Sequence, residues 1–297
     1  MQSSLQLDLC LGTASQGRGG SGYRGMRNPT EAKSQVYDLA RNNPDFIKII
    51  FDDPTAERGA IDRKTLEAAI QAAHDLQIRV IVHIGTWKNA EIAAKAKADA
   101  ITHFYDDEEI SPEALQAMKE FAVVSIPTFA VQTEMGHLVK NVEAVIGDSL
   151  LQKVSSLNFL NQYKDRAQYS DRATRWAQDQ DEDEIRDSKS IKQLARAGIT
   201  LLAGSDAGNI GVFQGYSVHR EMELWTKAGI STWDALSGAT TKAAEFLGIR
   251  EGFRPGDEAN FLILSRSPLE DIRATREIEG LIFKGRLIER SQLISQF

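Results

Sequence analysis

The feature that most constrains the fold is a series of short apolar runs that recurs along the chain. These runs are rich in valine, isoleucine and phenylalanine and do not alternate cleanly with polar residues: Leu5–Leu11, Phe46–Phe51, Val80–Ile84, Ala100–Phe104, Ala122–Ile126 and Ile199–Ala203. Strands buried on both faces of a sheet have this pattern. Amphipathic segments lie between the runs, among them Arg63–Leu76 and Pro112–Phe121. The alternation predicts a parallel α/β sheet with crossover helices.

Length and composition limit the partners of such a fold. The 297 residues suit one large α/β barrel domain. The formal net charge of −7 argues against a nucleic-acid partner, because phosphate binding needs a basic face. No apolar run approaches the roughly 20 residues of a membrane helix, and we expect no membrane partner. The N-terminus does not read as a signal peptide, and Cys10 is the sole cysteine, so we expect a reducing, cytoplasmic setting.

Three regions interrupt the strand–helix rhythm. Residues 12–25 are predicted to be a glycine-rich loop, and residues 134–190 a polar, helical insertion whose acidic run Asp179–Glu184 is solvated. The tail changes character, with short strands predicted at Asn260–Leu264, Glu277–Phe283 and Arg286–Ile288. We therefore predict a barrel over residues 1–255 and the C-terminal strands of a small β domain over residues 256–297.

Chemically capable side chains stand in or just after four of the apolar runs: Lys48, His83, His103 and Asp206. The carboxyl ends of parallel barrel strands face one mouth, where active sites form. A single histidine at a strand end is usually structural, but two at successive strand ends together with an aspartate favour a metal site. A lysine in an apolar strand is costly to bury unpaired. Lys48 therefore either lies at a sheet edge, pairs with Asp52 or Asp53, or is neutral and reacts with carbon dioxide to give a carbamate ligand.

The order and spacing of these stretches resemble the amidohydrolase superfamily, nearest its imidazolonepropionase-like and prolidase-like branch. The resemblance runs from about residue 28 to about residue 290. It is carried by Asp45-Phe-Ile-Lys-Ile49, Val80-Ile-Val-His83, Ile101-Thr-His103, Leu202-Ala-Gly-Ser-Asp-Ala-Gly208, His219-Arg-Glu221, Ala235-Leu-Ser-Gly-Ala-Thr240, Pro255-Gly-Asp-Glu-Ala-Asn260 and Ser267-Pro-Leu-Glu-Asp-Ile272.

The resemblance implies a (β/α)8 barrel that hydrolyses carbon–nitrogen bonds, in an amide or cyclic amide, of a small molecule or dipeptide. It implies one or two divalent metal ions, most commonly Zn²⁺. Lys48 would be the carboxylated ligand, His83 and His103 further ligands, and Asp206 both a ligand and the general base. His219 and Glu221 would lie near the substrate. The alternative for these two residues is the start of a solvated helix.

One departure from the family is the missing His-x-His pair of the first strand. The five histidines are His74, His83, His103, His137 and His219, and no two stand two residues apart. Counted back from Lys48, Leu5–Leu11 corresponds to the third barrel strand, so we expect an incomplete barrel that holds strands 3–8. An open barrel leaves strand edges unpaired, and we therefore expect homo-oligomers.

Two other functions compete with this interpretation. The segment Gly17-Arg-Gly-Gly-Ser-Gly22 matches the G-x-G-x-x-G of dinucleotide-binding enzymes, but it does not directly link a strand to a helix as that fingerprint requires. A catalytically dead relative, acting as a binding module or surviving as a fragment, is favoured by the missing His-x-His. Cys10 lies in an apolar run and is interpreted as a core residue.

Overall fold

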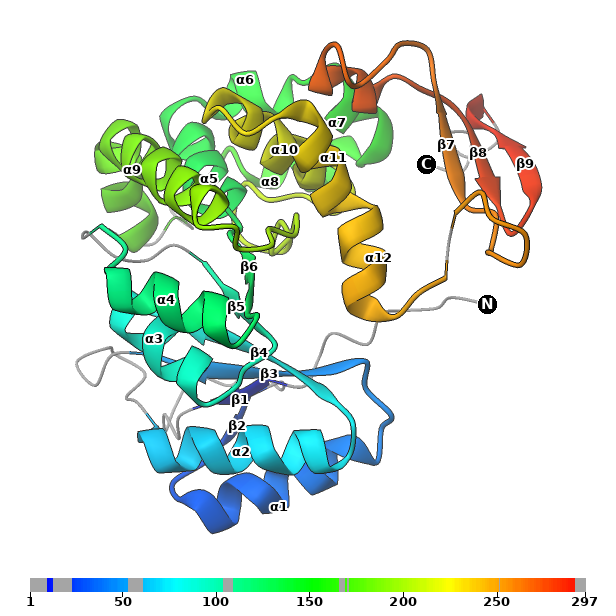
Figure 1. The fold of residues 1–297 in the computed structure, drawn as a ribbon. Coiled ribbons are helices and arrows are strands. Elements are labelled where there is room, and N and C mark those ends of the chain that lie inside the picture. Colours follow the sequence, from blue (N-terminus) through cyan, green and yellow to red (C-terminus); the bar gives the residue numbers. More distant parts are fainter. Residues whose placement is uncertain are drawn as a thin grey trace. The chain divides into compact units, whose positions relative to one another are not determined.

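The computed structural model describes residues 10–12, 23–52, 61–103, 109–165, 169, 171–250 and 252–291. The chain divides into two compact units, shown along the ribbon in Figure 1. The first unit comprises residues 1–127 and 193–201, and the second comprises residues 128–192 and 202–297. Each unit has its own secondary structure.

A parallel sheet forms the centre of the first unit. Its strand order is β2-β1-β3-β4-β5-β6, and every pair of neighbours is parallel. The strands are β1 (Cys10–Gly12), β2 (Tyr23–Gly25), β3 (Phe46–Phe51), β4 (Arg79–Ile84), β5 (Ala100–Thr102) and β6 (Val124–Ile126). The parallel α/β arrangement predicted from the apolar runs is therefore confirmed.

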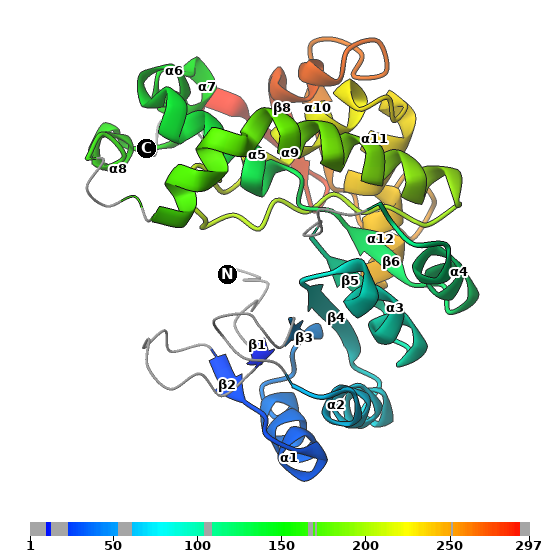
Figure 2. The ribbon, with the colours of Figure 1, turned by 90° about the vertical axis from the view of Figure 1, so that its left-hand side faces the viewer.

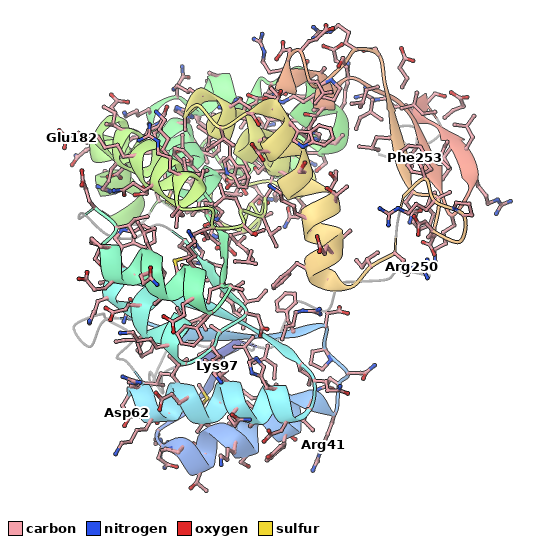
Figure 3. The ribbon with its side chains drawn as sticks, in the orientation of Figure 1. Arg41, Asp62, Lys97, Glu182, Arg250 and Phe253 are labelled. Carbon is pink, nitrogen blue, oxygen red and sulfur yellow. The ribbon has the colours of Figure 1, made fainter. Side chains whose placement is uncertain are left out.

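Four helices cover one face of this sheet. They are α1 (Pro29–Ala40), α2 (Arg63–Asp75), α3 (Trp87–Lys95) and α4 (Pro112–Glu120). Figure 2 shows them ranged along the outside of the strands. Each begins after a residue whose side chain accepts a hydrogen bond from the first turn, at Asn28, Asp62, Thr86 and Ser111. Asp62 is labelled at the start of α2 in Figure 3. The side chains of Ile47, Ile49, Val80, Val82 and Ile101 are fully buried.

Two parts of the sheet differ from the prediction. Residues 199–203 were expected to form a strand, but the structure shows one parallel bridge, between Leu201 and Ser125. Tyr23–Gly25, expected to lie in a loop, pairs with β1 because its backbone extends alongside Cys10–Gly12. Residues 5–9 and 13–22 of the predicted first strand and loop lie outside the described residues. Within the described part of the chain, the parallel strands form the open sheet expected of an incomplete barrel.

The second unit contains the predicted insertion. Its residues are helical, in α5 (Ala130–Lys140), α6 (Val142–Ile146), α7 (Ser149–Val154), α8 (Leu157–Gln162) and α9 (Asp171–Arg196). The insertion is less polar in its packing than its composition suggests, because α5 to α8 supply a buried apolar cluster: Leu138, Val142, Ile146, Leu151 and Leu160, with Phe213 and Tyr216. The acidic run was expected to be solvated, but this holds only in part, since Asp181 is exposed while Asp183 is buried.

The remaining helices of this unit are α10 (Ser217–Lys227), α11 (Thr232–Ala239), α12 (Thr241–Leu247) and the 3₁₀ helix η2 (Ile272–Arg276). An antiparallel sheet follows, in the order β7 (Phe261–Leu264), β8 (Ile278–Phe283) and β9 (Arg286–Glu289). Lys284 and Gly285 both have positive φ and form the two-residue turn between β8 and β9. The tail strands are thus where the sequence predicts them. Phe253, labelled in Figure 3, stacks on Phe261 at a centroid distance of 4.2 Å.

Among the described residues, no helix combines the length and the apolar character that crossing a membrane requires.

Candidate functional site

Lys48 lies on β3, an internal strand of the parallel sheet. On β3 it alternates with Ile47 and Ile49, whose side chains are fully buried. Its side-chain nitrogen Nζ donates a hydrogen bond of 2.6 Å to the hydroxyl Oγ1 of Thr102 on β5, two strands away. The strand register places Ile50, two residues after Lys48, beside His83, and His83 beside Thr102. Lys48, His83 and Thr102 therefore share one face of the sheet.

The two histidines predicted from successive strand ends lie in contact. The rings of His83 and His103 meet edge to face, with 4.6 Å between their centroids. His83 is the penultimate residue of β4, and His103 follows β5, where its N–H donates to the carbonyl of Ile126. His103 is buried and has a φ of +81°, a conformation that costs energy in residues other than glycine and is frequent at functional sites.

Sequence reasoning missed two residues of this cluster as members of a site. Thr102 was counted only as part of an apolar run, yet its hydroxyl is the acceptor for Lys48. Asp52 was considered only as a partner of Lys48, yet its Oδ2 lies 3.9 Å from Nε2 of His83. The available signal was their position at the carboxyl ends of parallel strands. Asp53, the other suggested partner of Lys48, lies outside the described residues.

Asp206 belongs to the second unit. It is exposed, has a φ of +49°, and receives hydrogen bonds from Nδ2 of Asn209 at both its carboxylate Oδ2 and its own carbonyl, each 2.9 Å long. Asn209 is a further residue that sequence reasoning missed. Lys48, His83 and His103 belong to the first unit, and the convergence of Asp206 with them stays a prediction.

Glu221 lies on α10, is fully buried and is not part of a solvated helix start. Its carboxylate accepts hydrogen bonds from the backbone N–H of Phe129 at 3.0 Å and of Ala130 at 2.7 Å, and from Nε1 of Trp225 at 2.9 Å. Phe129 and Ala130 lie at the N-terminus of α5, so Glu221 acts as an N-cap for that helix from a distant part of the sequence. Burial raises the pKa of Glu221 to about 7, although the backbone hydrogen bonds favour its ionised form.

His219 is also buried, with its Nδ1 2.9 Å from the hydroxyl Oγ1 of Thr275 in η2. Burial, together with the positive charge of Arg276, lowers the pKa of His219 to about 4. His219 is therefore neutral at pH 7. Contact of His219 and Glu221 with a substrate stays a prediction.

Ion pairs connect α10 to its neighbours within the second unit. The Nε of Arg220 lies 3.1 Å from Glu134 on α5, and Arg220 also pairs with Glu223. Glu223 in turn lies 2.6 Å from Arg276 of η2. Glu134 is almost fully buried, which by itself raises its pKa, but His137 and Arg220 outweigh burial and lower it. This network holds α10 in place while Glu221 caps α5.

The donors at the strand ends are of a type that fits a divalent cation. Zn²⁺ binds imidazole nitrogen and carboxylate oxygen, and His83, His103 and Asp52 supply both at one end of the sheet. Among the described residues, however, no group of three or more His, Cys, Asp or Glu side chains could hold a metal ion as they lie in this structure. A cation would therefore require these side chains to move closer to one another.

Residues 41–288 match the sequence profile described as "Amidohydrolase family". The match covers most of the chain, and the chain belongs to this family. The resemblance seen in the sequence is therefore confirmed.

Similar solved structures share this fold. They include a Xaa-Pro dipeptidase with methionine bound in its active site (19% identity, TM-score 0.66, 95% of this chain and 66% of that one). A bottromycin amidohydrolase is also similar, with 19% identity and a TM-score of 0.68 over 96% of this chain and 64% of that one. So is the ochratoxinase of A. niger, with 16% identity and a TM-score of 0.64 over 96% of this chain and 60% of that one. This chain thus spans about two thirds of their length or less. No curated protein sequence matches it.

Proposed function

We propose that this chain is a metal-dependent hydrolase that cleaves a carbon–nitrogen bond, in an amide or cyclic amide, of a small molecule or dipeptide. The observation that carries the proposal is the contact of His83 with His103 at the ends of adjacent parallel strands, on the sheet face that Lys48 occupies. Membership of the amidohydrolase family supports it. The names of the similar structures, a dipeptidase and an amidohydrolase, agree with an amide substrate.

In this proposal His83, His103, Lys48 and Asp206 hold one or two divalent cations, most commonly Zn²⁺. A bound cation supplies Lewis acidity towards water and towards the scissile carbonyl. The neutral amine of Lys48 can add to carbon dioxide and lose a proton, which turns it into an anionic oxygen ligand, and Thr102 positions this side chain. Asp206 accepts a proton from the attacking water and returns it to the leaving nitrogen. His219 and Glu221 border the substrate side of the site.

We also propose the partner, the location and the association of the enzyme. The partner is a small-molecule substrate rather than nucleic acid or membrane, the protein acts in the cytoplasm, and copies of the chain associate through exposed strand edges. Size-exclusion chromatography with light scattering tests the association. A monomer at micromolar concentration would contradict it.

An activity screen tests the reaction. The purified chain is incubated with Zn²⁺, Mn²⁺ or Co²⁺ and offered N-acyl amino acids, dipeptides ending in proline, and imidazolones. We expect release of the free amine or carboxylate in the wild type and not in Asp206→Asn, which keeps the size of the side chain but cannot act as a base. Equal turnover by both proteins, or activity that resists removal of metal with a chelator, would contradict the proposal.

A second candidate is a catalytically inactive relative that acts as a binding module. The observation that favours it is the absence of a His-x-His pair from all 297 residues. Metal content separates the two functions. The hydrolase retains at least one divalent cation per chain after dialysis against buffer, whereas the inactive relative retains none.

A further inference from the structure

We infer that Thr275 holds the ring of His219 as the tautomer that carries its proton on Nδ1, so that Nε2 is a hydrogen-bond acceptor for an N–H or O–H group of the substrate. This inference rests on the proposed function, because it gives His219 a specific role on the substrate side of the same site. His219 lies on α10 and Thr275 in η2, and both belong to the second unit. The contacts that fix the tautomer therefore lie within one unit.

The hydroxyl of Thr275 determines which ring nitrogen is protonated. A threonine hydroxyl has a single proton to donate. Oγ1 of Thr275 donates it over 2.8 Å to the carbonyl oxygen of Ile272, which can only accept. Nδ1 of His219 lies 2.9 Å from the same Oγ1. Because the proton of the hydroxyl is already directed at Ile272, Nδ1 must itself be the donor and carry the ring proton.

The charge state of the ring leaves Nε2 without a proton. Burial and the positive charge of Arg276 lower the pKa of His219 to about 4, so the ring is neutral at pH 7. A neutral imidazole has one N–H group and one nitrogen with a lone pair. With the proton on Nδ1, the lone pair lies on Nε2, which can accept a hydrogen bond but cannot donate one.

The surroundings of Nε2 leave room for a donor from the substrate. His219 is only 9% exposed, and within the described part of the chain its one hydrogen bond is the contact with Thr275. A largely buried acceptor that receives no hydrogen bond costs free energy, which an N–H or O–H group of the substrate would recover. A metal ion could also use the lone pair, but no three His, Cys, Asp or Glu side chains of the described residues could hold one. The geometry therefore favours a substrate that offers a hydrogen-bond donor to Nε2.

Nuclear magnetic resonance on the full chain tests the tautomer. In protein with isotope-labelled histidine, long-range proton–nitrogen correlations at pH 7 distinguish Nδ1–H from Nε2–H, and His219→Phe identifies the signals of His219 by their loss. Thr275→Val removes the hydroxyl with little change in size, and Thr275→Ser keeps it as the matched control. We expect the Nδ1–H tautomer in the wild type and in Thr275→Ser, and a large share of the Nε2–H tautomer in Thr275→Val. An Nε2–H tautomer in the wild type, or an unchanged tautomer in Thr275→Val, would overturn the inference and leave the proposed hydrolase standing.

Steady-state kinetics on the substrate found in the screen test the role of Nε2. In Thr275→Val, an Nε2–H group would face the donor of the substrate, so we expect kcat/KM to fall about 10-fold, while Thr275→Ser should match the wild type. An unchanged kcat/KM in Thr275→Val, with the altered tautomer, would refute the contact with the substrate. If circular dichroism shows that Thr275→Val does not fold, His219→Phe replaces it, and wild-type kcat/KM in that variant refutes the contact. If the wild type turns over no substrate, the proposed function fails and the contact with it, whereas the wild-type resonance data still decide the tautomer.

Discussion

The amide of Asn209 donates to both the carboxylate and the carbonyl oxygen of Asp206, at 2.9 Å each. One side chain therefore fixes the rotamer and the left-handed backbone of the proposed base. Without Asn209, the exposed carboxylate of Asp206 would lose both of these hydrogen bonds.

We expect Asn209→Ala to lower kcat by about 10–100-fold with little change in KM, because residues that orient metal ligands have effects of this size. The measurement is steady-state kinetics on the substrate found in the screen. Asn161→Ala, an exposed residue on α8, is the control and should keep wild-type kinetics. An unchanged kcat in Asn209→Ala would show that the two hydrogen bonds have no part in the reaction.

Lys48 offers a second prediction. If its carbamate is a ligand, Lys48→Ala should lose bound metal and activity, and short carboxylic acids with bicarbonate should partly restore metal binding. Lys48→Arg should also lack bound metal and activity, because its guanidinium stays cationic and cannot bind a metal ion. The measurement is metal content by atomic absorption after dialysis. Normal metal content in Lys48→Ala would refute the role of Lys48 as a ligand.

Glu221 should make stability depend on pH. Its pKa is about 7 in the folded chain and 4.5 as the ordinary value, so the folded state binds more protons between these values. Its contribution to the free energy of unfolding is therefore fully present below pH 4.5 and lost as pH rises towards 7. In urea unfolding, the advantage of the wild type over Glu221→Gln should fall by up to about 3 kcal/mol across this window. A constant difference between the two proteins from pH 4.5 to 7.5 would contradict the shift.

The pKa of His219 shifts in the opposite direction to that of Glu221. Its pKa falls from 6.5 to about 4 on folding, so the unfolded chain binds more protons between these values. Its contribution is present above pH 6.5 and lost as pH falls towards 4. In an NMR titration, we expect the His219 imidazole to titrate near pH 4, well below exposed histidines. A midpoint near 6.5 would show that the ring is solvated in solution.

The apolar cluster of the helical insertion should be important for stability. Leu138 is fully buried in it, whereas Leu157 on α8 is 61% exposed. We expect Leu138→Ala to lower the free energy of unfolding by roughly 2–5 kcal/mol, because it removes buried surface and leaves a cavity. Leu157→Ala, the same chemical change at the surface, should cost well under 1 kcal/mol. Equal losses in the two variants, measured by urea unfolding, would contradict this assignment of the core.

Much of the secondary structure followed from local pattern. The run Phe46–Phe51 is a strand over the predicted residues, and the amphipathic segment Pro112–Phe121 contains the helix α4. The three tail strands lie where short apolar runs surround Lys284 and Gly285. These features depend on residues only a few positions apart, so the local sequence pattern is enough to predict them.

Part of the candidate site could also be predicted from the positions of polar residues along the predicted strands. Lys48, His83 and His103 could be grouped because active-site residues of parallel strands gather towards their carboxyl ends, and the structure places His83 and His103 in contact at that edge, with Lys48 in the middle of β3 on the same sheet face as His83. For Asp206 the same rule makes a prediction that depends on how two compact units assemble.

Only the tertiary structure decided which side chains from distant segments contact one another. Thr102 bonds Lys48 from a distance of 54 residues, and Glu221 caps a helix that begins 91 residues before it. Asp52 lies beside His83 because β3 and β4 are in one particular register. Composition and spacing are properties of a single segment, whereas burial and hydrogen-bond geometry arise when distant segments pack together. A buried carboxylate such as Glu221 therefore looks, in the sequence alone, like any residue on the polar face of a helix.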